Sequence, residues 1–189
     1  MQTSHSISEK ICLTCGLCCN GVIFADVQLQ NGDSAERLKA LGLPLVLRRK
    51  SRAVVSVPPG EAGGPRYQFP QPCSAFDGCL CQIYPERPTH CRAFECALLK
   101  SVQRGQTKPD GAIRTIEKAR RQAGKVRELL RQLGDNDEQM ALSLRFRKTA
   151  KRLQEGEINA HTADTFSQLT LAAHDLNLVL SEKFYPGHA

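Results

Sequence analysis

The second half of the chain carries three runs of apolar residues at helical spacing. The first run is followed by Gly134 and consists of Ile116, Ala119, Ala123, Val126, Leu130 and Leu133. A second run covers residues 142–153, through Leu142, Phe146, Thr149 and Leu153, and precedes Gly156. A third covers residues 166–180 and ends before Pro186. Residues three or four apart share one face of an α-helix, so each run predicts an amphipathic helix, and a following glycine is a typical stop. One apolar stripe per helix favours helices that pack on one another or on the first half of the chain.

The first half has a less regular pattern. Asp33 and Glu36 resemble a capping box, and Leu38 and Leu41 then lie on one face of a short helix that Gly42 ends. Two short strands are predicted over residues 53–57 and 66–69, on either side of a loop rich in proline and glycine. This apolar core is thin for about 100 residues, so we expect bound metal to supply part of the folding free energy.

The change of pattern near Gly105 predicts two units. Residues 1–100 are expected to form a small, irregular, metal-stabilised domain that is rich in cysteine. Residues 111–185 are expected to form an all-α unit of three helices, and residues 101–111 join the two. The fold class is therefore predicted to be α+β.

Cysteine is the unusual feature of the composition. The chain has 189 residues and nine cysteines, an odd number, and all of them lie between Cys12 and Cys96. The first ten residues lack the apolar core of a signal peptide. The longest apolar stretch, residues 41–47, is far shorter than the roughly 20 residues that span a bilayer. We therefore expect a cytoplasmic protein without a membrane partner, in which clustered thiols bind metal or serve redox chemistry.

The first cysteine cluster has the spacing of a metal-binding loop. Cys12, Cys15 and Cys18 form C-x₂-C-x₂-C, which matches the first three ligands of the bacterial ferredoxin run. A loop that curls around one centre can aim three such sulfurs inward, and Gly16 permits the backbone angles that a tight curve needs. Adjacent side chains rarely point the same way. We therefore expect Cys18 and Cys19 to serve two metals, or one of them to pack instead.

The second cluster supplies further sulfur ligands. Its gaps are irregular, whereas tetrahedral zinc sites favour paired C-x₂-C ligands. Iron–sulfur ligation accepts a distant fourth cysteine, so the spacing favours an iron–sulfur cluster over Zn²⁺ without deciding between them. Buried, inert thiols are the alternative for some positions. Cys79 makes the count odd and is left out of the predicted ligand set, which is Cys12, Cys15, Cys18, Cys19, Cys73, Cys81, Cys91 and Cys96.

In these residues the chain resembles the CxxCxxCC (YkgJ-type) family of zinc- or iron-chelating cysteine-cluster proteins. The resemblance rests on residues 12–19, on Cys73 and on residues 81–96, which keep each element of the pattern C-x-I-Y-x-x-R-P-x-x-C-R-x-F. It covers about half of the chain. A more distant likeness is to the flagellin lysine methylase, a much longer protein that shares the cysteine motif. That likeness implies methyl transfer with an iron–sulfur cluster.

The other residues of the second motif have predicted roles beside the metal. Arg87 and Arg92 are expected to donate hydrogen bonds to thiolate sulfurs, and Tyr84 to offer a packing face with a polar tip. His90 is a possible ligand, although a surface position is the expectation for it. The sequence identifies no catalytic residue.

These observations predict a metal-binding protein whose C-terminal helices cover the cluster or dock a protein partner. One alternative is a cluster-dependent enzyme for methyl transfer or redox chemistry, with an open metal position or a low-pKa thiolate among Cys19, Cys79 and Cys96. Another is a basic nucleic-acid or partner-binding adaptor, because residues 114–131 carry a net charge of +5. No base-stacking aromatic residues interrupt that run, which is typical of a solvated helix face, so a nucleic-acid partner is not expected.

The overall charge is also weak evidence for a nucleic-acid partner. The formal value of +7 counts every cysteine as neutral. Four thiolates on one [4Fe–4S]²⁺ cluster would lower it to +5, and eight thiolates on two zinc ions to +3.

Overall fold

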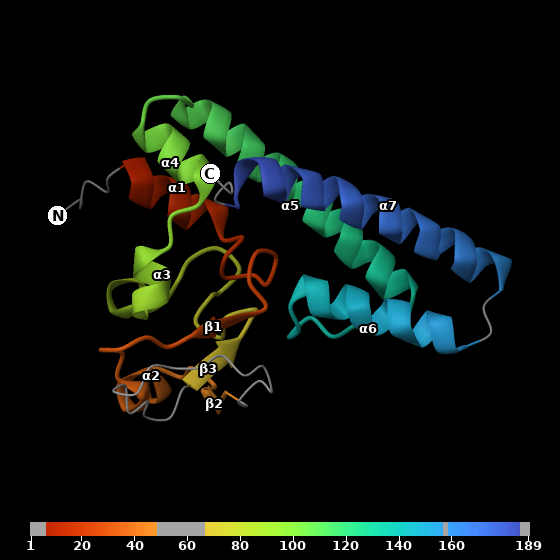
Figure 1. The fold of residues 1–189 in the computed structure, drawn as a ribbon, viewed down its shortest axis with the longest axis horizontal. Coiled ribbons are helices and arrows are strands. Elements are labelled where there is room, and N and C mark those ends of the chain that lie inside the picture. Colours follow the sequence, from red (N-terminus) through yellow and green to blue (C-terminus); the bar gives the residue numbers. More distant parts are fainter. Residues whose placement is uncertain (1–6, 49–66, 157–158, 186–189) are drawn as a thin grey trace, which may run out of the picture.

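The chain folds into α-helices and one small sheet, which confirms the predicted α+β class. The computed structural model describes residues 7–48, 67–156 and 159–185, which are drawn in colour in Figure 1. None of the helices in these ranges combines the length and the apolar content that crossing a bilayer requires. The elements are α1 (Ile7–Cys15), β1 (Asp26–Gln28), α2 (Ala35–Ala40), β2 (Val46–Leu47), β3 (Tyr67–Pro70), the 3₁₀ turn η1 (Tyr84–Glu86), α3 (Thr89–Ala93), α4 (Ala97–Gln103), α5 (Pro109–Gln132), α6 (Leu142–Glu155) and α7 (Ala160–Lys183).

The three predicted C-terminal helices are confirmed as α5, α6 and α7. Helix α5 is followed by Gly134, whose φ of 80° is the left-handed conformation typical of a helix stop. Gly156 caps the end of α6, and the side chain of Asn159 caps the start of α7 by accepting a hydrogen bond from Thr162 N at 2.8 Å. Helices α5 and α7 lie side by side along much of their length (Figure 1).

Helix α6 differs from the predicted apolar stripe. Phe146 and Leu153 are only partly buried, whereas Arg145 is 1% exposed. Its guanidinium donates to the carboxylate of Asp135 at 3.0 Å, to the carbonyl of Asp135 at 3.0 Å and to the carboxylate of Glu138 at 2.9 Å. These partners satisfy the buried charge. A pattern of apolar residues could not reveal it, because arginine counts there as an exposed residue.

The sheet has the antiparallel strand order β1-β3-β2. Strand β3 corresponds to the strand predicted over residues 66–69. The strand predicted over residues 53–57 lies outside the described residues. Strands β1 and β2 were not predicted, because segments of three and two residues carry no readable alternation. Val27 of β1 pairs with Phe69 of β3, and both side chains are buried.

Helix α2 occurs where it was predicted, but Asp33 does not cap it. The cap is Ser34, whose hydroxyl accepts from Arg37 N at 3.2 Å. The Asp33 carboxylate instead accepts hydrogen bonds from the backbone N–H and the hydroxyl of Thr89, at 2.8 and 2.7 Å. Asp33 therefore attaches α2 to the start of α3, which carries Cys91.

The buried apolar residues form two cores. The larger core joins α1 and α4 to α5 and α7, through residues such as Leu17, Leu99, Ile116 and Leu180. It draws on both sides of the predicted joint at residues 101–111, so the division of the chain there stays a prediction. The smaller core lies between the sheet and α2 and consists of Val27, Leu38, Leu43, Phe69, Ala75 and Ile83.

Replacing Arg145 by alanine should lower the free energy of unfolding by about 3–5 kcal/mol, because the buried Asp135 carboxylate would lose its partner. Urea denaturation measures this change. Lys148→Ala is the matched control, since Lys148 of the same helix forms an exposed pair with Asp137, at 3.6 Å. It should cost at most about 1 kcal/mol. Equal effects of the two substitutions would contradict the role given to Arg145.

Candidate metal centre

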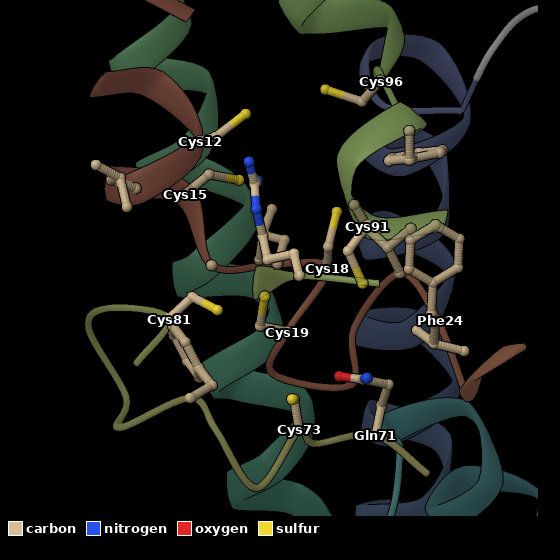
Figure 2. A pocket seen from close by; sticks show the side chains of 18 of the residues that line it. Cys12, Cys15, Cys18, Cys19, Phe24, Gln71, Cys73, Cys81, Cys91 and Cys96 are labelled. Atoms are coloured by element: carbon tan, nitrogen blue, oxygen red, sulfur yellow. The ribbon is translucent and has the colours of Figure 1, made fainter. Parts of the chain in front are cut away.

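Side chains of all nine cysteines line one pocket. The cavity measures about 120 Å³ and draws its cysteines from residues 12–19 and 73–96, two segments far apart in the sequence. Figure 2 shows eight of these cysteines around the cavity. None of the nine forms a disulfide. The pocket thus places the eight predicted ligands, and Cys79 at an exposed position, around a common space.

The first cysteine cluster begins on a helix and continues in a turn. Cys12 and Cys15 belong to α1, where positions three apart share one face. The predicted loop is therefore partly wrong. The C-x₂-C spacing suits a helix as well as a loop, because both place the two sulfurs on one side. The helix ends at Cys15, and the chain then turns at Gly16, whose carbonyl accepts hydrogen bonds from Cys19 N and Asn20 N at 3.0 and 2.9 Å.

Gly16 is required for both its conformation and its lack of a side chain. Its φ is 64°, which confirms the predicted need for glycine at this turn. A Cβ atom at this position would lie 2.7 Å from Cζ of Phe76. Phe76 in turn forms a β-bridge with Cys81, so the ring holds the second cysteine cluster against the first.

The cysteines of the second cluster are placed by local backbone structure. Cys73 N donates to the carbonyl of Cys19 at 2.8 Å, which links the two clusters directly. Cys91 lies on α3. Cys96 caps the N-terminus of α4, and its Sγ accepts from Leu99 N at 3.4 Å.

Burial favours the neutral form of three pocket thiols. It raises the pKa of Cys15, Cys19 and Cys91 to about 12, and neighbouring thiols add to the rise. Among residues 7–48, 67–156 and 159–185, no three His, Cys, Asp or Glu side chains are arranged to hold a metal ion. The sulfurs therefore share a pocket without forming a closed ligand cage. A thiophilic metal must displace their protons and draw the sulfurs inward.

Arg87 and Tyr84 line this pocket, and Arg92 does not; the role of the first two beside a metal stays a prediction. The Arg87 guanidinium lies 3.5 Å from the centre of the Tyr84 ring, and its Nε donates to the Tyr84 carbonyl at 2.8 Å. Its charge lowers the pKa of both Cys12 and Cys91, against the larger effect of burial. Arg92 is exposed and lines a second cavity of about 200 Å³ together with Asp33.

Within the described residues, two polar side-chain atoms of the pocket have no hydrogen-bond partner. Gln71 is 2% exposed, and its Oε1 accepts no hydrogen bond within the described part of the chain. His90 was expected at the surface, but it is half-buried, and its Nε2 also has no partner there. The His90 ring packs edge-on against Phe24, with centroids 5.1 Å apart. Buried polar atoms of this kind indicate a site that a bound group completes. Gln71 was not singled out from the sequence, because an isolated glutamine carries no motif.

The C-terminal helices bind the backbone around the first cluster and form part of the pocket wall. Arg120 and Arg127 of α5 donate to the carbonyls of Thr14 and Asn20 at 3.0 and 3.1 Å, and burial lowers the pKa of Arg127. Two members of the predicted solvated basic face therefore bind backbone around the cysteines. Ile116 of α5 and Phe184 after α7 line the cavity. No sequence signal connects these positions across more than 90 residues.

A comparison with family models agrees with this geometry. The model named CxxCxxCC, described as "Putative zinc- or iron-chelating domain", matches residues 11–112, which include all nine cysteines. No curated protein and no solved structure matches the chain.

Gly16→Ala should destabilise the protein by more than the roughly 1–2 kcal/mol of a left-handed alanine, because the new methyl group also meets Phe76. Thermal denaturation of the full chain measures this. Gly105→Ala is the matched control, since Gly105 has a similar φ of 71° and open space around it. Equal losses would show that the contact with Phe76 adds no constraint.

The reduced, metal-free protein should lose stability as the pH rises above 9. The thiols ionise near pH 9 in the unfolded chain and near pH 12 in the folded one, so the unfolded state loses protons first. The free energy of unfolding is thus highest below pH 9, where the thiols are neutral in both states, and it declines as the pH rises towards 12. Urea denaturation between pH 8 and 10.5 measures the decline. The metal-loaded protein is the control and should show no such decline, because its folded state has no thiol proton to lose and binds fewer protons than its unfolded state.

Proposed function

This chain belongs to the CxxCxxCC family, whose matched region is described as a zinc- or iron-chelating domain, and we propose that its eight motif cysteines hold an iron–sulfur cluster. The proposed ligands are Cys12, Cys15, Cys18, Cys19, Cys73, Cys81, Cys91 and Cys96. Zn²⁺ is the second candidate for the same thiols.

The convergence of free thiols carries this proposal. Cysteines from two distant segments face one cavity, and none of them is oxidised to a disulfide. Thiolates are soft ligands that select zinc and iron–sulfur clusters over hard cations such as Mg²⁺ and Ca²⁺. The unpartnered atoms of Gln71 and His90 in the same pocket further support a bound group.

The size of the cavity favours a guest of several atoms. Its 120 Å³ is several times the roughly 10–15 Å³ that one water molecule needs, which exceeds the need of one cation. The C-x₂-C-x₂-C spacing of Cys12, Cys15 and Cys18 also fits iron–sulfur ligation. When bound, such a cluster supplies one-electron redox chemistry or structural cross-links.

The surrounding residues would tune the bound group. Arg87 presents its charge to Cys12 and Cys91, and this offsets the negative charge that thiolate ligands bring into a buried pocket. Its stacking on Tyr84 fixes that charge in place. Arg92 lines the second cavity instead.

The protein purified without oxygen should contain iron and matching inorganic sulfide, and it should absorb visible light. Elemental analysis, a sulfide assay and an absorption spectrum measure these properties. Colourless protein with stoichiometric zinc would overturn the cluster and retain chelation by the same thiols. Protein without stoichiometric metal would overturn both.

Cys15→Ser should lower the metal content, because Cys15 is half-buried in the pocket wall at the end of α1. Cys79→Ser is the matched control. It also removes one thiol from the pocket lining, but at an exposed position outside the proposed ligand set. Equal metal loss in the two variants would contradict the ligand assignment.

A further inference from the structure

The eight proposed ligands fall into two sets of four. The helical set comprises Cys12, Cys15, Cys18 and Cys96. The sheet-side set comprises Cys19, Cys73, Cys81 and Cys91. In Figure 2, Cys12, Cys15 and Cys96 gather at one end of the pocket, and Cys19, Cys73 and Cys81 gather at the other.

The two cores separate the same sets. Cys15 and Cys96 pack against the larger core of α1, α4, α5 and α7. Cys73, Cys81 and Cys91 pack against the smaller core beneath the sheet. Two members of the helical set and three of the sheet-side set thus pack against different bodies of buried apolar residues.

Mutual proximity within the helical set appears in its electrostatics. After burial, the thiol that most raises the pKa of Cys12 and of Cys15 is Cys96. For Cys18 the largest such contribution comes from Cys15, and Cys96 and Cys12 also contribute. Cys19, the neighbour of Cys18 in the chain and a member of the other set, also raises the pKa of Cys18, after Cys15 and ahead of Cys96 and Cys12.

The sheet-side set shows the same mutual proximity. After burial, the pKa of Cys19 is raised by Cys81, Cys73 and Cys91, in that order, and only then by Cys15. The pKa of Cys91 is raised by Cys73 and Cys81. The hydrogen bond from Cys73 N to the Cys19 carbonyl holds Cys19 on this side.

We propose that the pocket contains two separate metal sites of four thiolates each, one formed by the helical set and one by the sheet-side set. The boundary between the two sites lies between the adjacent residues Cys18 and Cys19. This inference rests on the proposed function. Four cysteines are the complete ligand set of either a [4Fe–4S] cluster or a structural zinc ion. The helical set, with C-x₂-C-x₂-C and a remote fourth cysteine, has the ligand pattern of an iron–sulfur cluster. The sheet-side set is a second thiophilic site. Arg87 faces Cys12 of one set and Cys91 of the other, so one cation serves both.

The adjacent pair gives the sharpest test. The reduced, metal-free full chain is loaded with Zn²⁺ alone or with ferrous iron and sulfide, desalted, and its metal content is measured. The variant Cys12→Ser/Cys15→Ser disables the helical set and should retain half of the wild-type metal. Adding Cys18→Ser to it should change nothing further, because that set is already disabled. Adding Cys19→Ser instead should remove the remaining half.

A single shared site predicts a different result. Cys12→Ser/Cys15→Ser would then lose all metal, or Cys18→Ser and Cys19→Ser would have equal effects in that background, and either outcome overturns the two-site inference alone. A wild-type chain that binds neither zinc nor iron overturns the proposed function as well. Far-UV circular dichroism monitors α5 and α7, to confirm that the variants fold.

A second test uses the wild-type chain alone, so it applies even where the variants fail to fold. Fully loaded protein is stripped in steps with a chelator, alkylated, and digested for mass spectrometry. Four cysteines of one set should become reactive together while the other four stay protected. Simultaneous exposure of cysteines from both sets at every step would overturn the inference.

Discussion

The whole arrangement depends on how the backbone between Gly16 and Gly21 is held. This short segment leaves α1, carries Cys18 and Cys19, and contributes Leu17 to the larger core. Its carbonyl groups receive hydrogen bonds from Cys73 N, from Arg127 and from Leu142 N, the last at 2.9 Å to Gly21. The second cysteine cluster, α5 and α6 thus each bind the same six residues. Because these donors come from distant parts of the chain, the pocket is a product of the tertiary fold and not of a local motif.

The family match and the fold have different extents. The match ends at residue 112, near the start of α5. Ile116, Leu130 and Leu180 lie beyond it, yet they pack in one core with Leu17 and Leu99. The C-terminal helices therefore complete the hydrophobic support of the matched region. This explains how a segment with few apolar residues of its own keeps seven of the eight proposed ligands half-buried, with Cys12 exposed.

Sequence reasoning succeeded where one physical rule dominates. Apolar periodicity located α5, α6 and α7, because each buries one face, and the cysteine motif indicated that two segments converge. It failed where a side chain serves a remote partner. Arg145 breaks the apolar stripe of α6 because a buried carboxylate neutralises it. The sequence pattern predicts solvated charges for Arg120 and Arg127, because their partners lie 106 and 107 residues away. The sequence predicts Asp33 as a helix cap, but its carboxylate accepts hydrogen bonds from Thr89 instead.

The immobilised guanidinium of Arg87 has a consequence for affinity. Its ring contact and its Nε hydrogen bond both involve Tyr84, three residues before it, so they persist whether or not a ligand is present. The entropy cost of ordering this long side chain is met on folding. Preorganisation of this kind leaves less reorganisation to oppose ligand capture, and anionic thiolates form against a positive pole that is already in position.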